Sequence, residues 1–135
     1  MTESHNSEIT GWIKSNSVGI YGIDYSWKKG EHTQRGVFNP DFFIKFKNRI
    51  IVAEIKGDEQ VSNPDIENIA KYKAAIEHFN YINKKLKKDK IDIKYKFTMI
   101  TPRSFEVFFN AFNSENTCDI DGFISQLDAA IQESL

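Results

Sequence analysis

Residues 39–57 read Asn-Pro-Asp-Phe-Phe-Ile-Lys-Phe-Lys-Asn-Arg-Ile-Ile-Val-Ala-Glu-Ile-Lys-Gly, and the rest of the chain is organised around them. Two runs rich in aromatic and β-branched residues, 42–46 and 50–55, flank the polar pair Lys47-Asn48. This pattern predicts two antiparallel strands joined by a tight turn. The second run is apolar on both faces, which predicts a strand in the middle of a sheet that is covered by helices.

A turn at Lys47-Asn48 determines which residues face each other across the hairpin, and it pairs Asp41 with Glu54. Opposed residues point to the same face, with Cβ atoms about 5 Å apart, and Lys56 joins them because it follows Glu54 by two positions. Facing carboxylates repel each other, so this pattern favours a cation between them. Mg²⁺ prefers such oxygen ligands, and a lysine beside them can meet a phosphate or position a water molecule.

These residues also carry a resemblance to a known family. Pro40-Asp41, twelve further residues and then Glu54-Ile55-Lys56 resembles the motif of the PD-(D/E)xK nuclease superfamily. The flanking segments are similar to the endonuclease domain that ends type III restriction enzyme subunits: Ile20 to Trp27, Asn-Pro-Asp-Phe-Phe-Ile, Ile-Val-Ala-Glu-Ile-Lys-Gly and the run of ten residues that begins Lys71-Tyr-Lys-Ala-Ala. The similar region covers roughly residues 8–83.

The resemblance implies a Mg²⁺-dependent endonuclease, with Mn²⁺ as a substitute, that hydrolyses DNA phosphodiester bonds in a restriction or DNA-processing system. Asp41 and Glu54 would hold the metal, with the Ile55 carbonyl as a third ligand, and Lys56 would orient or activate the attacking water. The implied partners are DNA and either a helicase or translocase subunit or a methyltransferase subunit. A homodimer is also compatible, because two nicks make a double-strand break.

Three further residues are accessory candidates. Relatives often carry an acid on a first helix, so Glu8 is a candidate metal ligand; alternatively it complements the helix dipole. The family often places a basic or amide residue on the helix after the hairpin, which points to Lys71; alternatively Lys71 is solvated, as lysines on helix flanks usually are. Asn68 interrupts the apolar stripe of the same helix and is the third candidate.

Two basic segments are candidates for nucleic-acid contact. The denser one contains Lys84, Lys85, Lys87, Lys88 and Lys90, which are either an edge that contacts phosphates or the charged end of a helix. The other is the loop 28–36, with Lys28, Lys29, His32 and Arg35, which is either a loop that touches DNA or a solvated turn.

Composition limits the class of protein. The chain has 135 residues, enough for one domain with a core, and its net charge of −1 excludes a generally basic nucleic-acid binder. Cys118 is the only cysteine, so no disulfide forms within the chain. We see no apolar signal region, membrane span or GxxxxGK[ST] phosphate loop, and expect a cytoplasmic protein without a motor of its own. It is either a domain of a larger enzyme or a stand-alone relative.

The expected fold is α/β: a single restriction-endonuclease-like domain over 1–135, with residues 1–6 disordered and a mixed four-stranded sheet between helices. The expected order is a short helix over 7–13, a strand over 18–27, the central hairpin, a helix over 64–88, a strand over 91–100, a helix from 102 and a last helix capped by Asp121, with Ile124 buried. The alternative function is a catalytically inactive module of the same fold that binds nucleic acid or a protein partner.

Overall fold

The computed structural model describes residues 9–14, 22–113 and 115–135, and its main element is a mixed sheet. The order of the strands is β1-β4-β5-β6. β1 pairs antiparallel with β4, β4 antiparallel with β5, and β5 parallel with β6. The strands are β1 (Ile9–Lys14), β4 (Phe42–Phe46), β5 (Arg49–Ile55) and β6 (Lys94–Ile100).

The predicted central hairpin is confirmed in its register. Phe42 pairs with Ala53 and Phe46 with Arg49 across the turn at Lys47-Asn48, and Lys47 adopts a left-handed φ of 53°. β5 lies inside the sheet and is apolar on both faces, as expected. The register therefore places residues 41 and 54 next to each other at the open end of the hairpin.

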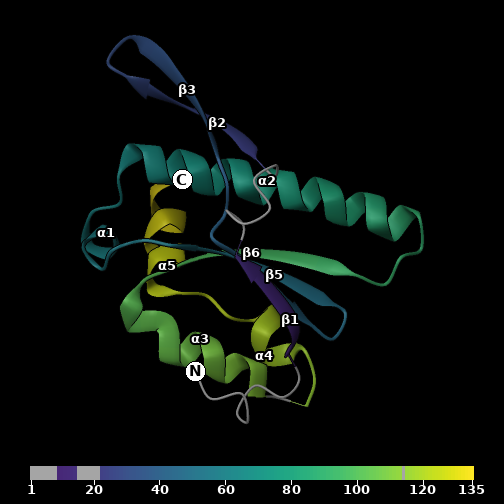
Figure 1. Ribbon diagram of the computed structural model, residues 1–135. Coiled ribbons are helices and arrows are strands. Elements are labelled where there is room, and N and C mark those ends of the chain that lie inside the picture. Colours follow the sequence, from purple (N-terminus) through teal and green to yellow (C-terminus); the bar gives the residue numbers. More distant parts are fainter. Residues whose placement is uncertain (1–8, 15–21, 114) are drawn as a thin grey trace.

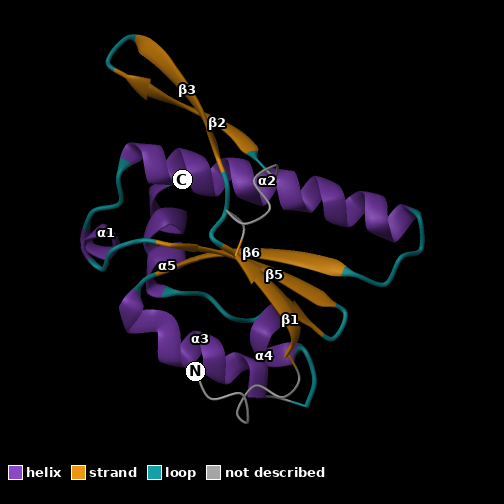
Figure 2. Cartoon of the chain, in the orientation of Figure 1, coloured by secondary structure: helices purple, strands orange, loops and turns teal. Residues whose placement is uncertain are grey.

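Helices cover both faces of the sheet, and each face has its own apolar core (Figure 2). On one face, Val52, Phe97 and Met99 pack with residues of α2 (Ile66–Lys88) and α5 (Gln126–Ser134). On the other face, Ile51 and Ala53 pack with Phe108 and Phe112. The elements on that side are α3 (Phe105–Asn110), η4 (Ala111–Asn113) and α4 (Cys118–Asp121), while α1 (Glu59–Ser62) and η3 (Pro102–Ser104) are short connecting turns.

β2 (Ile23–Lys29) and β3 (His32–Phe38) form a separate two-stranded ribbon that lies against α2 (Figure 1). The expectation that the strand over 18–27 joins the main sheet is therefore wrong, and residues 18–21 lie outside the described part. Ile23 and Phe38 are buried at the base of the ribbon, whereas residues 28–33 are all exposed. The polar outer half offers no apolar face that a larger sheet could bury, which explains the separation.

The helix predicted over 7–13 is also wrong, because residues 9–14 form strand β1, in which Trp12 pairs with Ile44. Isoleucine and tryptophan favour strands, Gly11 disfavours a helix, and the exposed edge of β4 offers backbone partners. Local periodicity could not reveal that edge. Glu8, its neighbour Ser7 and the segment 1–6 lie outside the described residues.

Several boundaries also differ from the prediction. β6 begins at Lys94 instead of residue 91, and α2 begins at Ile66 instead of residue 64. Ser125 caps α5, while Asp121 binds Arg49 instead, with an oxygen–nitrogen distance of 2.7 Å. Ile124 was expected in the core but is 58% exposed, because it precedes the helix whose apolar stripe it was assigned to.

Asp128 of α5 and the N-cap residue Ser125 form hydrogen bonds with the outer edge of β6. The buried Asp128 accepts hydrogen bonds from the Thr98 hydroxyl at 2.5 Å, the Met99 N–H at 2.9 Å and the Ser125 N–H at 3.1 Å. The Ser125 hydroxyl in turn accepts from the Asp128 N–H. Burial raises the pKa of Asp128, whereas these hydrogen bonds lower it. The network binds the backbone of β6 at Met99, on the edge of the sheet that β5 does not cover.

Candidate active site

Asp41, Glu54 and Lys56 meet at the open end of the β4–β5 hairpin. Asp41 directly precedes β4, and one oxygen of its carboxylate accepts a hydrogen bond from the Ile55 N–H at 2.8 Å. The Lys56 Nζ lies 3.4 Å from an oxygen of Glu54. Glu54 and Lys56 follow Val52 by two and four positions, so all three side chains point to the same face of the sheet. Val52 packs against α2, and the group therefore lies between the sheet and that helix.

Glu54 is the electrostatic centre of this group. Its side chain is 7% exposed, and its Oε1 atom is buried without a hydrogen-bond partner. Burial, followed by the charge of Asp41, raises the pKa of Glu54 from 4.5 to about 7, although the charge of Lys56 lowers it. Near neutral pH the acid form of Glu54 is therefore populated alongside the carboxylate.

Lys71 brings a second ammonium group to the site from α2. Burial and the charge of Lys56 lower the pKa of Lys71, while the charge of Glu54 raises it. Lys71 therefore interacts electrostatically with both of these side chains. The Lys71 Nζ lies 5.3 Å from the ring centroid of Tyr25 and 5.7 Å from that of Phe38. Both rings belong to the β2–β3 ribbon, so the ribbon forms one wall of the site.

Tyr25 also ties the ribbon to α2 by a hydrogen bond. Its hydroxyl donates to Glu67 at 2.6 Å, and burial together with this carboxylate raises the pKa of Tyr25 to about 12. Sequence reasoning did not single out Tyr25, Phe38 or Glu67. The alternation of β2 marks the face that Tyr25 occupies, but its partner is 42 residues away and no local signal identifies it.

The predicted accessory residue Asn68 has a different partner. Asn68 is buried, and its amide donates to Gln60 at 3.0 Å, which joins α1 to the start of α2. The candidate ligand Glu8 is outside the described residues.

The lysine cluster at 84, 85, 87, 88 and 90 is exposed at the C-terminal end of α2. Lys88 follows Lys71 by 17 residues, which at the helical rise corresponds to about 25 Å. The structure thus brings Asp41, Glu54, Lys56 and Lys71 together but not this cluster.

The donor set suits a hard cation. Within the described part of the chain, no group of three or more His, Cys, Asp and Glu side chains is placed to hold a metal ion. Mg²⁺, however, is commonly held by one or two carboxylates, with water and phosphate oxygens completing its shell. Asp41 and the unpartnered oxygen of Glu54 supply such ligands, and a cation there would relieve the repulsion between the two acids.

Comparisons with known proteins identify no relative: no family model, no curated protein and no solved structure matches the chain. None of the helices that the structure describes has the length and apolar character needed to cross a membrane.

Proposed function

We propose that this chain is a Mg²⁺-dependent endonuclease domain that hydrolyses DNA phosphodiester bonds. The observation that supports it best is the buried, unpartnered oxygen of Glu54 beside Asp41, with Lys56 3.4 Å away from the same carboxylate. A carboxyl whose pKa is raised by burial and by a neighbouring acid lowers the stability of the metal-free fold, so a function that uses the repulsion is favoured over a structural role.

Each residue has a role in this proposal. Asp41, Glu54 and the Ile55 carbonyl would hold the metal, which on binding would lower the pKa of a water nucleophile and offset charge on the phosphate. The hydrogen bond from the Ile55 N–H fixes the Asp41 carboxylate in position for this task. Lys56 orients the attacking water and meets the negative charge that develops on the phosphate, and Lys71 adds a second positive charge.

We extend the proposal to the fold and to the assembly. The core is restriction-endonuclease-like, and the domain works within a restriction or DNA-processing system that supplies a helicase or translocase. The mixed sheet with acids at one end of a central hairpin and helices on both faces supports this assignment.

The second candidate is a binding module of the same fold that does not cut. It is favoured by the small ligand set, because the described residues provide only two acids at the site. Such a module would bind nucleic acid in EDTA as well as in Mg²⁺, whereas cleavage by the enzyme requires the metal.

The test incubates plasmid and single-stranded DNA with the chain in Mg²⁺, Mn²⁺ or EDTA. We expect metal-dependent cleavage that is lost in Asp41→Asn and Lys56→Ala and kept in Lys45→Ala, since Lys45 is exposed on the same hairpin. Metal binding has its own readout: Mg²⁺ should raise the melting temperature of the wild type more than that of Asp41→Asn. DNA binding without cleavage in any metal would favour the second candidate.

A further inference from the structure

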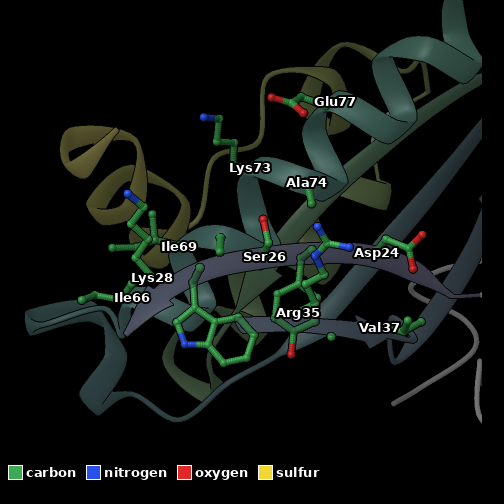
Figure 3. Close-up of a pocket in the computed structure, with 14 residues that line it drawn as sticks. Asp24, Ser26, Lys28, Arg35, Val37, Ile66, Ile69, Lys73, Ala74 and Glu77 are labelled. Atoms are coloured by element: carbon green, nitrogen blue, oxygen red, sulfur yellow. The ribbon is translucent and has the colours of Figure 1, made fainter. Parts of the chain in front are cut away.

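A groove of about 890 Å³ separates the β2–β3 ribbon from one flank of α2 (Figure 3). The ribbon contributes both of its strands to the lining, and α2 contributes residues spaced by three and four positions, which form one side of the helix. The lining residues on α2 are Ile66, Ile69, Ala70, Lys73, Ala74 and Glu77.

The charge of the groove differs in sign from that of the whole chain. Lys28, Arg35 and Lys73 line it together with Asp24 and Glu77, so cations outnumber acids in a chain whose net charge is −1. All five of these side chains are exposed. In Figure 3, Lys28 lies beside Ile66 at the end of the groove near the start of α2, whereas Asp24 lies toward the other end.

Exposed apolar side chains and half-buried aromatic rings accompany these charges. Trp27 lines the groove and stacks on Tyr25, with ring centroids 5.3 Å apart and planes inclined by 14°. Ile66 and Val37, which are 65% and 62% exposed, are also part of the lining. Cations that follow a groove beside aromatic rings are the combination with which proteins bind single-stranded nucleic acid, because bases stack on the rings.

The groove borders the candidate active site. Tyr25 belongs to its wall, and the same ring lies 5.3 Å from the Lys71 Nζ. The groove residue Ala70 directly precedes Lys71 in α2. A nucleic-acid strand in the groove would therefore reach the acids of the site by passing Tyr25. The lysine cluster at 84–90 lies farther along α2.

We propose that this groove binds a single-stranded stretch of DNA and leads it to the catalytic group. Lys28, Arg35 and Lys73 contact phosphates, and Trp27 stacks on a base. The inference rests on the proposed nuclease function for its substrate, but its test does not need cleavage.

The test measures the affinity of the chain for a labelled single-stranded oligonucleotide in EDTA at several salt concentrations. The groove variant carries Lys28→Ala, Arg35→Ala and Lys73→Ala. The matched control carries Lys84→Ala, Lys85→Ala and Lys88→Ala, which removes the same charge from equally exposed positions.

We expect the groove variant to bind about 10- to 100-fold more weakly and to lose roughly two units of salt slope, as the loss of three phosphate contacts on a single strand requires. The control should change affinity less than about threefold. Circular dichroism should show both variants folded, because every substituted side chain is exposed.

Two further variants test the sign and the place of the effect. Glu77→Gln removes a negative charge from the groove and should tighten binding. In a Trp12→Phe background, Trp27 is the only tryptophan, so its fluorescence should change on binding in the wild-type groove and less in the groove variant.

Equal or greater weakening of the control, unchanged affinity of the groove variant, or preference for duplex DNA overturns the inference. The proposed function fails separately. If the groove variant binds weakly as expected but the wild type never cuts in Mg²⁺ or Mn²⁺, the binding role of the groove is supported and the nuclease function is refuted. If the wild type cuts and the groove variant cuts single strands with an unchanged KM, the binding role of the groove is refuted and the nuclease function is supported.

Discussion

Substitution of Glu54 by glutamine should stabilise the metal-free protein at alkaline pH. The carboxyl is buried beside Asp41, and its pKa is raised from 4.5 to about 7. At about 1.36 kcal/mol per pKa unit, this shift means that the ionised form costs the fold about 3 kcal/mol. Glu54→Gln keeps the size of the side chain and removes the charge, so it removes most of that cost.

The effect should depend on pH in a defined direction. The unfolded chain releases the Glu54 proton near pH 4.5 and the folded chain near pH 7, so between these values the folded state holds more protons. Unfolding free energy therefore falls as pH rises through this window, and the full cost is present above it. Glu54→Gln should raise the free energy of unfolding by up to about 3 kcal/mol at pH 8.5 and by almost nothing at pH 4.

The assay is urea unfolding in EDTA, followed by circular dichroism at several pH values. Subtracting the wild-type curve from that of the variant cancels every other titrating group, and an unchanged m-value shows that the comparison is valid. Glu106→Gln is the matched control, because Glu106 is exposed. A difference that does not change with pH, or a loss of stability in Glu54→Gln at pH 8.5, would refute the burial and repulsion assigned to this carboxyl.

Three more predictions concern the same site and the edge of the sheet. Asp41→Asn should be more stable than Asp41→Ala by about 1–2 kcal/mol, because the asparagine oxygen can still accept the hydrogen bond from the Ile55 N–H and alanine has no acceptor. Denaturation of the two variants checks this, and equal stabilities would contradict it. Lys56→Met should raise the pKa of Glu54 further, since the lysine charge lowers it, so the loss of stability should extend to higher pH in the same unfolding series. Asp128→Ala should cost at least about 3 kcal/mol at every pH from 5 to 9, because it leaves three buried donors without an acceptor; a loss below about 1 kcal/mol would show that other groups satisfy them.

Local pattern was sufficient for the hairpin and for the meeting of its acids. Alternation of side chains and the position of the turn define which residues share a face, and both are properties of consecutive residues. For this reason the pairing around Asp41 and Glu54, the central place of β5 and the long helix α2 could be predicted from the residues alone. Lys71 was a candidate because of the family resemblance and not because of local pattern, and only the fold shows that the charge of Lys56 acts on it.

The remaining features depend on contacts between distant segments. Residues 9–14 have a helical spacing of apolar groups, yet they form a strand because the edge of β4 supplies hydrogen-bonding partners. The ribbon lies on α2 instead of extending the sheet, and only that placement sets Tyr25 beside Lys71 and opens the groove. Periodicity reports which face of an element is apolar; it carries no information about which other element will cover that face, because that choice minimises the exposed surface of the whole chain.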